Sequence, residues 1–217
     1  MDNTHDSTRR NQRASIAARL IPVVLVLVVM AFAIRYMLSE GPPVAIVGDS
    51  ITVVSAGQIS DQLDAYEVST RAVVGATASD MLPAAAELAQ KRPEQLVVNL
   101  GSNDVRRSFP ASQTEADYRT LLAGFPDTQC ITFVSINTHM DFGKGVQSKT
   151  AGALNVVLLK LASADQRISI VDWNTIVTDD MAAHAGKSTL IDDTVHPNAK
   201  GQKVLISAIH DQLKQCH

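Results

Sequence analysis

The chain has 217 residues, which is long enough for one domain with a well-buried core and too short for two large ones. Its formal net charge is −3 at pH 7, and five of its arginines lie before residue 41, so the remainder of the chain is more acidic still. This balance offers no basic surface for nucleic acid, and we therefore exclude nucleic acid as a partner.

The N-terminal region combines a basic tail with a long apolar segment. Residues 1–19 form the tail, and residues 20–38 are apolar apart from Arg35. A membrane-spanning helix needs about 20 mostly apolar residues, and an arginine near one end can extend its charge to the interface. The segment therefore predicts a transmembrane signal anchor, followed by a linker over residues 39–43.

The orientation of this anchor follows from the positive-inside rule, because the arginines of the tail precede the apolar segment. The N-terminus is predicted to be cytoplasmic, and everything after the linker to lie outside the plasma membrane. Ala31-Phe32-Ala33 also has the small-x-small form of a cleavage site, so a cleaved signal peptide and a secreted protein form the alternative. Both interpretations export the domain that follows.

Residues 44–217 alternate strand-like and helix-like segments. The strand candidates are short and rich in β-branched residues. They are Val44–Val47, Tyr66–Val74, Gln95–Leu100, Ile131–Ile136 and Arg167–Val171. Several show no polar alternation, as expected for parallel strands that are covered on both faces.

Helical patterns lie between these strands. Ser79-Asp80 is a candidate cap for a helix that runs to Ala89, and Lys149–Leu161 and Val204–Leu213 each place apolar residues on one stripe. Strands that alternate with helices predict an α/β fold, with a five-stranded parallel sheet between two helical layers. In such sheets ligands bind beyond the carboxyl ends of the strands.

Four polar blocks follow strands or precede the last helix, in positions that this fold would bring to one edge of the sheet. In chain order they are Gly48-Asp49-Ser50-Ile51, Gly75, Gly101-Ser102-Asn103-Asp104 and Asp193-Thr194-Val195-His196. His139 and the pair Arg106-Arg107 are also near this edge, but we expect them to be solvated.

The blocks together contain the parts of a serine esterase. Ser50 is the candidate nucleophile, and His196 is the candidate base that accepts its proton. Asp193, three residues before His196, is favoured over Asp192 as the carboxylate that orients the imidazole. The backbone N–H groups of Ser50 and Gly75 and the side-chain amide of Asn103 are candidate donors for the oxyanion.

With these blocks the sequence resembles the SGNH hydrolase superfamily, which is also called the GDSL esterases and lipases. The resemblance implies a flavodoxin-like strand order 2-1-3-4-5 and the catalytic set Ser50, Asp193 and His196. It also implies an oxyanion hole built from Ser50, Gly75 and Asn103, and no metal or organic cofactor. Ile51 stands where the block has leucine, an aliphatic change that leaves the chemistry intact.

The function predicted is an extracytoplasmic serine esterase that removes an O-acetyl group or another short acyl group through an acyl-enzyme on Ser50. The alternatives are an O-acetyltransferase acting on cell-envelope glycan and a lysophospholipase-like or thioesterase-like lipid hydrolase. An envelope-binding module without activity is the least favoured reading. The expected partners are a small-molecule, glycan or lipid acyl ester and the membrane itself. The oligomeric state stays open.

Two cysteines, Cys130 and Cys216, remain. In an exported domain an even pair favours a disulfide, here one that would tie the last helix to the entry of an inner strand. Two separate thiols, one buried and one in the C-terminal tail, fit the sequence equally well. The spacing does not match that of a metal site.

Overall fold

The computed structural model describes residues 41–216 and, of the chain before them, Met30 alone. The predicted basic tail (1–19), nearly all of the predicted membrane segment (20–38) and the first two linker residues therefore lie outside the described residues. Among the helices that are described, none has both the length and the apolar character needed to cross a membrane. The linker prediction ends too late, because Pro43 already belongs to the first strand.

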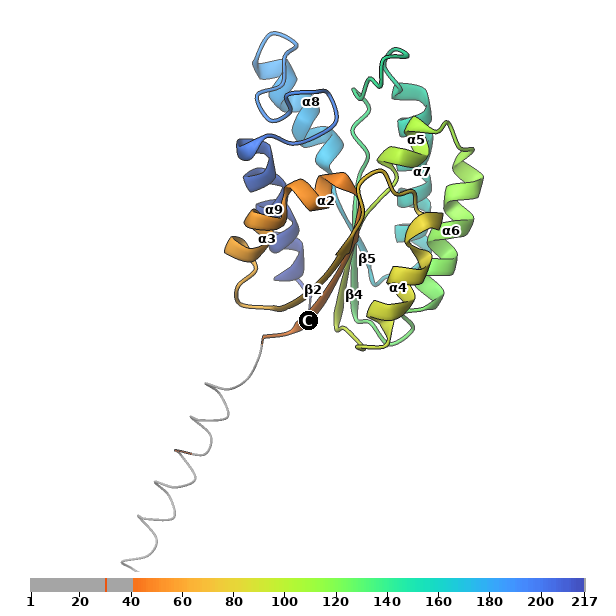
Figure 1. Ribbon diagram of the computed structural model, residues 1–217, viewed down its shortest axis with the longest axis vertical. Coiled ribbons are helices and arrows are strands. Elements are labelled where there is room, and N and C mark those ends of the chain that lie inside the picture. The colour runs from red at the N-terminus through yellow and green to blue at the C-terminus, as the bar shows by residue number, and fades with distance from the viewer. Residues whose placement is uncertain (1–29, 31–40, 217) are drawn as a thin grey trace, which may run out of the picture. The chain divides into compact units, whose positions relative to one another are not determined.

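Five parallel strands form the single sheet of the described domain (Figure 1). They are β1 (Pro43–Gly48), β2 (Glu67–Ala72), β3 (Gln95–Asn99), β4 (Cys130–Val134) and β5 (Ile168–Val171). Their order is β2-β1-β3-β4-β5, so the predicted order 2-1-3-4-5 is confirmed. β1 and β3 lie inside the sheet, and their buried side chains explain the apolar runs in the sequence.

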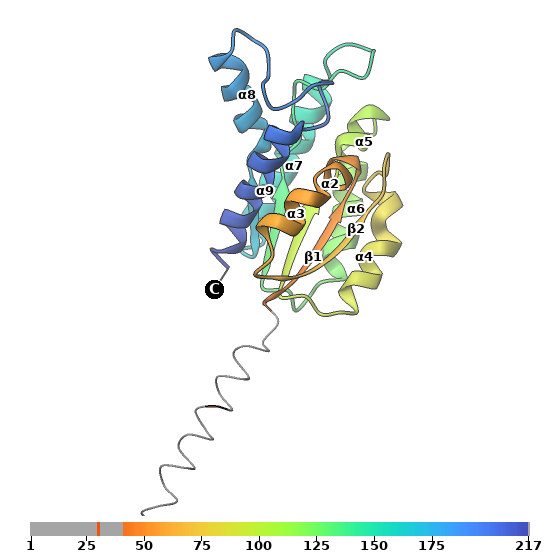
Figure 2. The same ribbon diagram turned by 60° about the vertical axis from the view of Figure 1, so that its left-hand side comes forward.

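Helices cover both faces of the sheet (Figure 1). One layer contains α2 (Ser50–Val54), α3 (Ala56–Gln62), α8 (Trp173–Ala183) and α9 (Ala199–Leu213). The other contains α4 (Leu82–Ala89), α5 (Ser102–Arg106), α6 (Ala111–Ala123) and α7 (Ser148–Ala164). Figure 2 shows α5 near the carboxyl ends of the strands and the end of α9 near their amino ends.

Alternation along the strands assigns each side chain to one of two hydrophobic cores. In β1, Ala45 and Val47 pack with α4, α6 and α7, whereas Val44 and Ile46 pack with α3, α8 and α9. This period of two follows from the geometry of an extended strand. Trp173, the only tryptophan, is fully buried in the second core.

Two local expectations are wrong. The second strand ends at Ala72 rather than Val74, and Val73 and Val74 instead form an exposed turn at the edge of the site. Asp80 does not cap α4, because its carboxylate accepts the backbone N–H of Thr77, 3.0 Å away, in a short 3-10 turn that precedes the helix. Both differences reflect chain reversals whose hydrogen bonds outweigh local propensity.

Cys130 and Cys216 form a disulfide, with their Cα atoms 5.8 Å apart. The bond joins the first residue of β4 to the segment that follows α9. The structure therefore favours the cross-linked alternative over two separate thiols. The C-terminal helix is fixed to the sheet at the amino ends of the strands.

Candidate active site

The polar blocks predicted from the sequence meet at the carboxyl edge of the sheet. They surround an open cavity of about 400 Å³. Its lining consists of Ser50, Val74, Gly75, Ser102, Asn103, Arg106, Asp141, Phe142, Asp193, Val195 and His196. Every residue that the sequence assigned a catalytic or oxyanion role is on this list.

Ser50 is presented by a sharp transition from β1 to α2. Asp49 is the N-cap of α2, and its side chain accepts the N–H of Ile51 at 2.9 Å. Ser50 is the first residue of the helix, so its own N–H has no partner within the helix. This leaves both the hydroxyl and the backbone N–H of Ser50 at the cavity, although only 7% of the residue is exposed.

A chain of two hydrogen bonds links Ser50 to Asp193 through His196. The imidazole Nε2 lies 2.9 Å from Ser50 Oγ, and Nδ1 lies 2.6 Å from Asp193 Oδ2. An ionised carboxylate only accepts hydrogen bonds, so Nδ1 carries the imidazole proton and Nε2 is free to accept from the serine. Burial raises the pKa of Asp193, but hydrogen bonds from His196 and from the backbone outweigh it and lower that pKa below its ordinary value.

The loop that carries Asp193 and His196 is held in an uncommon conformation. Asp193 Oδ1 accepts the N–H groups of Val195 and His196, which closes a tight turn. Thr194, which lies between Asp193 and Val195, has φ +71°, a left-handed value that is uncommon for a β-branched residue. Asp192 points elsewhere and accepts from Asn198 at 2.9 Å, so the structure brings Asp193 and not Asp192 to the imidazole.

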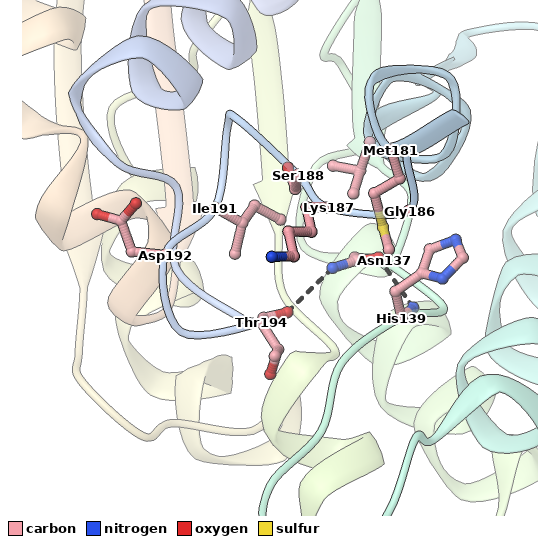
Figure 3. A pocket seen from close by; sticks show the side chains of 10 residues that line it. Asn137, His139, Met181, Gly186, Lys187, Ser188, Ile191, Asp192 and Thr194 are labelled. Carbon is pink, nitrogen blue, oxygen red and sulfur yellow. Dashed lines mark hydrogen bonds between the residues drawn. The ribbon is translucent and has the colours of Figure 1, made fainter. Parts of the chain in front are cut away.

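Thr194 is fixed by the loop that follows β4. Its hydroxyl accepts from the backbone N–H of Asp141 and donates to the Asp141 carbonyl, at 3.0 and 2.9 Å. Its carbonyl accepts from Asn137 Nδ2 at 3.1 Å (Figure 3). These contacts hold the strained residue in place. This support could not be predicted from the sequence, because it depends on two loops more than 50 residues apart.

A second cavity of about 340 Å³ lies on the other side of this loop (Figure 3). Thr194 and Asp192 line it, whereas Asp193 and His196 line the first cavity, so the loop forms the wall between the two. His139 lines this second cavity and contacts Thr178 Oγ1 at 3.0 Å, and it is therefore not part of the set around Ser50.

Gly75 and Asn103 reach the first cavity from two different loops. Gly75 has φ +78°, and no acceptor within residues 41–216 binds its N–H. Asn103 follows Gly101, whose φ of +116° favours glycine and where a Cβ would lie 2.7 Å from Tyr118 Oη. The sharp turn at Gly101 turns the chain from β3 into α5 and brings Asn103 beside Ser50 in the cavity wall.

Asp49 and Asp104 are buried carboxylates that brace these loops. Asp49 accepts from the Ser102 hydroxyl and, at 3.3 Å, from Asn103 Nδ2. Burial raises the pKa of Asp49, although the hydrogen bonds from Ser102 and Ile51 oppose this. Asp104 accepts from the Ala78 N–H and from Thr114, so its carboxylate joins the loop after β2 to α6.

Arg106 and Arg107 are both exposed, as expected from the sequence, but each also makes a contact within the site. Arg106 Nε donates to Asn103 Oδ1 at 3.1 Å. Arg107 donates to the carbonyl of Gly75 at 3.1 Å and lies 3.3 Å from Asp80. Each arginine therefore contacts one of the two loops that supply a candidate oxyanion donor.

Within the described part of the chain, no cluster of three His, Cys, Asp or Glu side chains has a geometry that would hold a metal ion. The polar groups of the cavity are instead arranged for proton transfer and for binding negative charge on an oxygen.

Asp180 of α8 anchors the segment that leads into the loop with Asp193 and His196. Its carboxylate accepts the N–H and the hydroxyl of Thr189, both at 2.6 Å, and the hydroxyl of Ser188 at 2.9 Å. Burial raises the pKa of Asp180, but these hydrogen bonds outweigh it and lower the pKa to about 2.

Replacing Asp180 with asparagine is expected to lower Tm at pH 7 by a few degrees, the usual size for lost charge-assisted hydrogen bonds in a protein of this length. Because the pKa is about 2 in the folded chain and about 3.9 in the unfolded one, the ionised group stabilises the fold above pH ~4. That contribution is lost as the pH falls from ~4 to ~2. Thermal unfolding across this range should show the two Tm values converging.

The matched control for this measurement is Asp179→Asn, which changes an exposed neighbour on the same helix. It should leave Tm almost unchanged at every pH. A difference between Asp180→Asn and the parent protein that stayed constant down to low pH would contradict the assigned hydrogen bonds.

Comparison with known proteins bears on the whole domain. A family model described as the GDSL-like lipase/acylhydrolase family matches residues 46–204. No curated protein matches the chain significantly.

Several solved structures share the fold. The C-terminal catalytic domain of peptidoglycan O-acetyltransferase A from Streptococcus pneumoniae has a TM-score of 0.64 and 17% identity, covering 82% of this chain and 96% of that one. An acetylxylan esterase from Geobacillus stearothermophilus has a TM-score of 0.66 and 17% identity, covering 81% and 95%. A GDSL-like lipase from Bacteroides thetaiotaomicron has a TM-score of 0.63 and 18% identity, covering 86% and 95%. At these identities the likeness shows a shared fold.

Proposed function

Since the chain belongs to the GDSL-like lipase/acylhydrolase family and is an ester-hydrolysing enzyme, we propose that it is an extracytoplasmic serine esterase. Its substrate in this proposal is an O-acetyl or other short acyl ester, cleaved through an acyl-enzyme on Ser50. The observation that carries the proposal is the hydrogen-bonded chain from Ser50 Oγ through His196 to Asp193 beside an open cavity.

The first half of the reaction forms the acyl-enzyme. Ser50 Oγ attacks the carbonyl carbon of the ester while His196 Nε2 takes the hydroxyl proton. The carbonyl oxygen becomes an oxyanion, which the N–H groups of Ser50 and Gly75 and the Asn103 amide bind. Asp193 stabilises the imidazolium of His196. The imidazolium then returns the proton to the leaving alcohol as the carbon–oxygen bond breaks.

The second half releases the acid. A water molecule takes the place of the alcohol, and His196 Nε2 accepts a proton from it as its oxygen attacks the acyl carbon. The same donors bind the second oxyanion. This oxyanion collapses as Ser50 Oγ leaves, and Ser50 Oγ regains its proton from His196. The products are the carboxylic acid and free enzyme, so no cofactor enters the balance.

The shape of the cavity favours a short acyl group. Its apolar lining consists of Val74, Phe142 and Val195, and the remaining lining residues are polar, charged or glycine. These three side chains can contact a short acyl group, whereas a long alkyl chain gains about 0.8 kcal/mol for each CH₂ that it buries and would need further apolar side chains to do so. Two of the similar structures are named for acetyl chemistry on polysaccharides, an acetylxylan esterase and a peptidoglycan O-acetyltransferase. A lipid or thioester hydrolase is the weaker alternative.

The proposed location rests on the sequence before residue 41 and on the disulfide. The apolar residues 20–38 behind a basic tail support a single-pass anchor with the N-terminus in the cytoplasm, or a secreted protein if the segment is cleaved. The Cys130–Cys216 bond agrees with an oxidising compartment. The proposal therefore places the substrate in the cell envelope.

The test is labelling of the full chain by a fluorophosphonate probe, followed by turnover of p-nitrophenyl esters of increasing acyl length. We expect labelling in the parent protein and in Ser60→Ala, an exposed serine of α3, but none in Ser50→Ala. Turnover should be highest for acetyl and fall as the acyl chain lengthens. Labelling that survives Ser50→Ala would overturn the assignment of Ser50 as the nucleophile. A parent protein that neither labels nor turns over would overturn the proposal and favour a binding module.

Transfer to a glycan differs from hydrolysis only in the molecule that attacks the acyl-enzyme. A mass-spectrometric assay that follows both acetate release and acetylation of an envelope glycan separates the two. Release of acetate without acetylated glycan supports hydrolysis, whereas acetylated glycan as the main product identifies an O-acetyltransferase.

A further inference from the structure

Arg106 is exposed, but its guanidinium lies beside the two loops that supply the candidate oxyanion donors Gly75 and Asn103. It is the last residue of α5, and its Nε donates to Asn103 Oδ1 at 3.1 Å. It lines the same cavity as Ser50 and His196. Its terminal Nη2 lies 3.6 Å from the position that a Cβ on Gly75 would occupy.

The contacts of Asn103 set the direction of its amide. Arginine Nε is only a donor, so it requires the amide oxygen on its side. On the other side, Asn103 Nδ2 lies 3.3 Å from Asp49 Oδ2, which is an acceptor when ionised. A reversed amide would place N–H against N–H at Arg106 and oxygen against carboxylate at Asp49. The two partners together therefore keep Nδ2 away from Arg106.

The direction of the amide matters because only Nδ2 can stabilise an oxyanion. Nδ2 carries two protons, so it can keep its bond to Asp49 and still donate to a substrate oxygen. The hydrogen bond from the guanidinium to Oδ1 also polarises the amide, which strengthens its N–H groups as donors.

We propose that Arg106 is a positioning residue of the oxyanion hole, which holds the Asn103 amide in its donating orientation. This inference rests on the proposed serine-esterase function. It differs from a role in binding an anionic substrate, which would need the guanidinium to contact the ligand and would have no effect on a neutral ester.

The test is a double-mutant cycle in the full chain with neutral p-nitrophenyl acetate as substrate. Arg106→Met should lower kcat about tenfold or more with little change in KM. Asn103→Ala should lower kcat by about 10²- to 10³-fold, the usual cost of losing an oxyanion donor. If Arg106 acts through Asn103, adding Arg106→Met to Asn103→Ala should lower kcat less than about twofold further.

Two further variants serve as a conservative replacement of Arg106 and as a control for the double-mutant cycle. Arg106→Lys keeps the charge and a donor and should recover part of the kcat that Arg106→Met loses. Arg71→Met removes an exposed arginine of β2 that pairs with Glu87, and it should behave like the parent protein. Losses that multiply in the double variant, or an unchanged kcat in Arg106→Met, would overturn the inference.

A readout independent of turnover separates failure of this inference from failure of the proposed function. The NMR signals of the Asn103 side-chain amide can be identified by their loss in Asn103→Ala. They should shift in Arg106→Met and stay in place in Arg71→Met, whether or not the protein cleaves esters. Unchanged signals of the Asn103 amide in Arg106→Met would contradict the proposed role of Arg106, even in an active enzyme.

Discussion

Replacing His196 with alanine is expected to lower kcat for ester cleavage on the order of 10⁴- to 10⁶-fold, because Ser50 then has no group to take its proton. The 2.9 Å contact between Nε2 and Ser50 Oγ is the structural reason. The side chain is 38% exposed, so its loss should change stability little. Steady-state turnover and thermal unfolding of the same preparation measure the two effects separately.

The control is His210→Ala, which removes an imidazole of α9 that packs edge-on against Tyr66 away from the cavity. It should keep the kcat of the parent protein. A His196→Ala variant that retained a tenth or more of the activity would show that another group accepts the serine proton.

Asp193→Asn should lower kcat by on the order of 10⁴-fold while leaving the loop in place. The asparagine oxygen can still accept from the backbone N–H groups of Val195 and His196. Its NH₂ would then face His196 Nδ1 as a donor and favour the tautomer whose proton sits on Nε2. That tautomer cannot accept from Ser50, so turnover falls although the hydrogen-bond geometry is nearly unchanged.

Removing the disulfide is expected to be the most destabilising change away from the site. With both Cys130 and Cys216 replaced by serine, the free energy of unfolding should fall by about 4 kcal/mol, the size expected for cross-linking a long loop. The bond spans 86 residues of sequence. Urea unfolding of the parent and of the double variant, each with and without dithiothreitol, measures the difference.

The activity of this double variant at 25 °C should remain close to that of the parent protein, since the bond lies at the amino ends of the strands and Ser50 at the carboxyl ends. Dithiothreitol should lower the stability of the parent protein and have no effect on the double variant. Equal stability of the oxidised parent and the double variant would contradict a structural role for the bond.

The sheet could be predicted because its strands are short runs rich in β-branched residues, and because the runs of β1 and β3 are also almost entirely buried, so that the signal is local. The helices were harder to predict from the sequence. α2 and α3 follow directly after the nucleophile turn, and their sequence contains β-branched Thr52, Val53 and Val54 and a glycine at 57, which disfavour a helix. They form because Asp49 caps α2, and because Ile51 and Ile59 pack against the second core.

Part of the site could also be predicted and part could not. Ser50, Asp193 and His196 stand in short sequence blocks, so their grouping could be predicted from the sequence. Arg106 was expected to be solvated, because its spacing of three residues from Asn103 does not show how the two side chains meet within α5. The support of Thr194 was missed because it comes from Asp141 and Asn137 in another loop, which becomes a neighbour only after the sheet has formed.

The placement of residue 41 has a consequence for how a substrate reaches the enzyme. The chain enters the described domain at the start of β1, and Ser50 lies beyond the other end of that strand. Six extended residues span about 20 Å. Anything tethered through residue 41 would therefore hold the domain by the end opposite its nucleophile. Under the proposed function, a substrate would then approach the cavity from the side of the domain that faces away from residue 41.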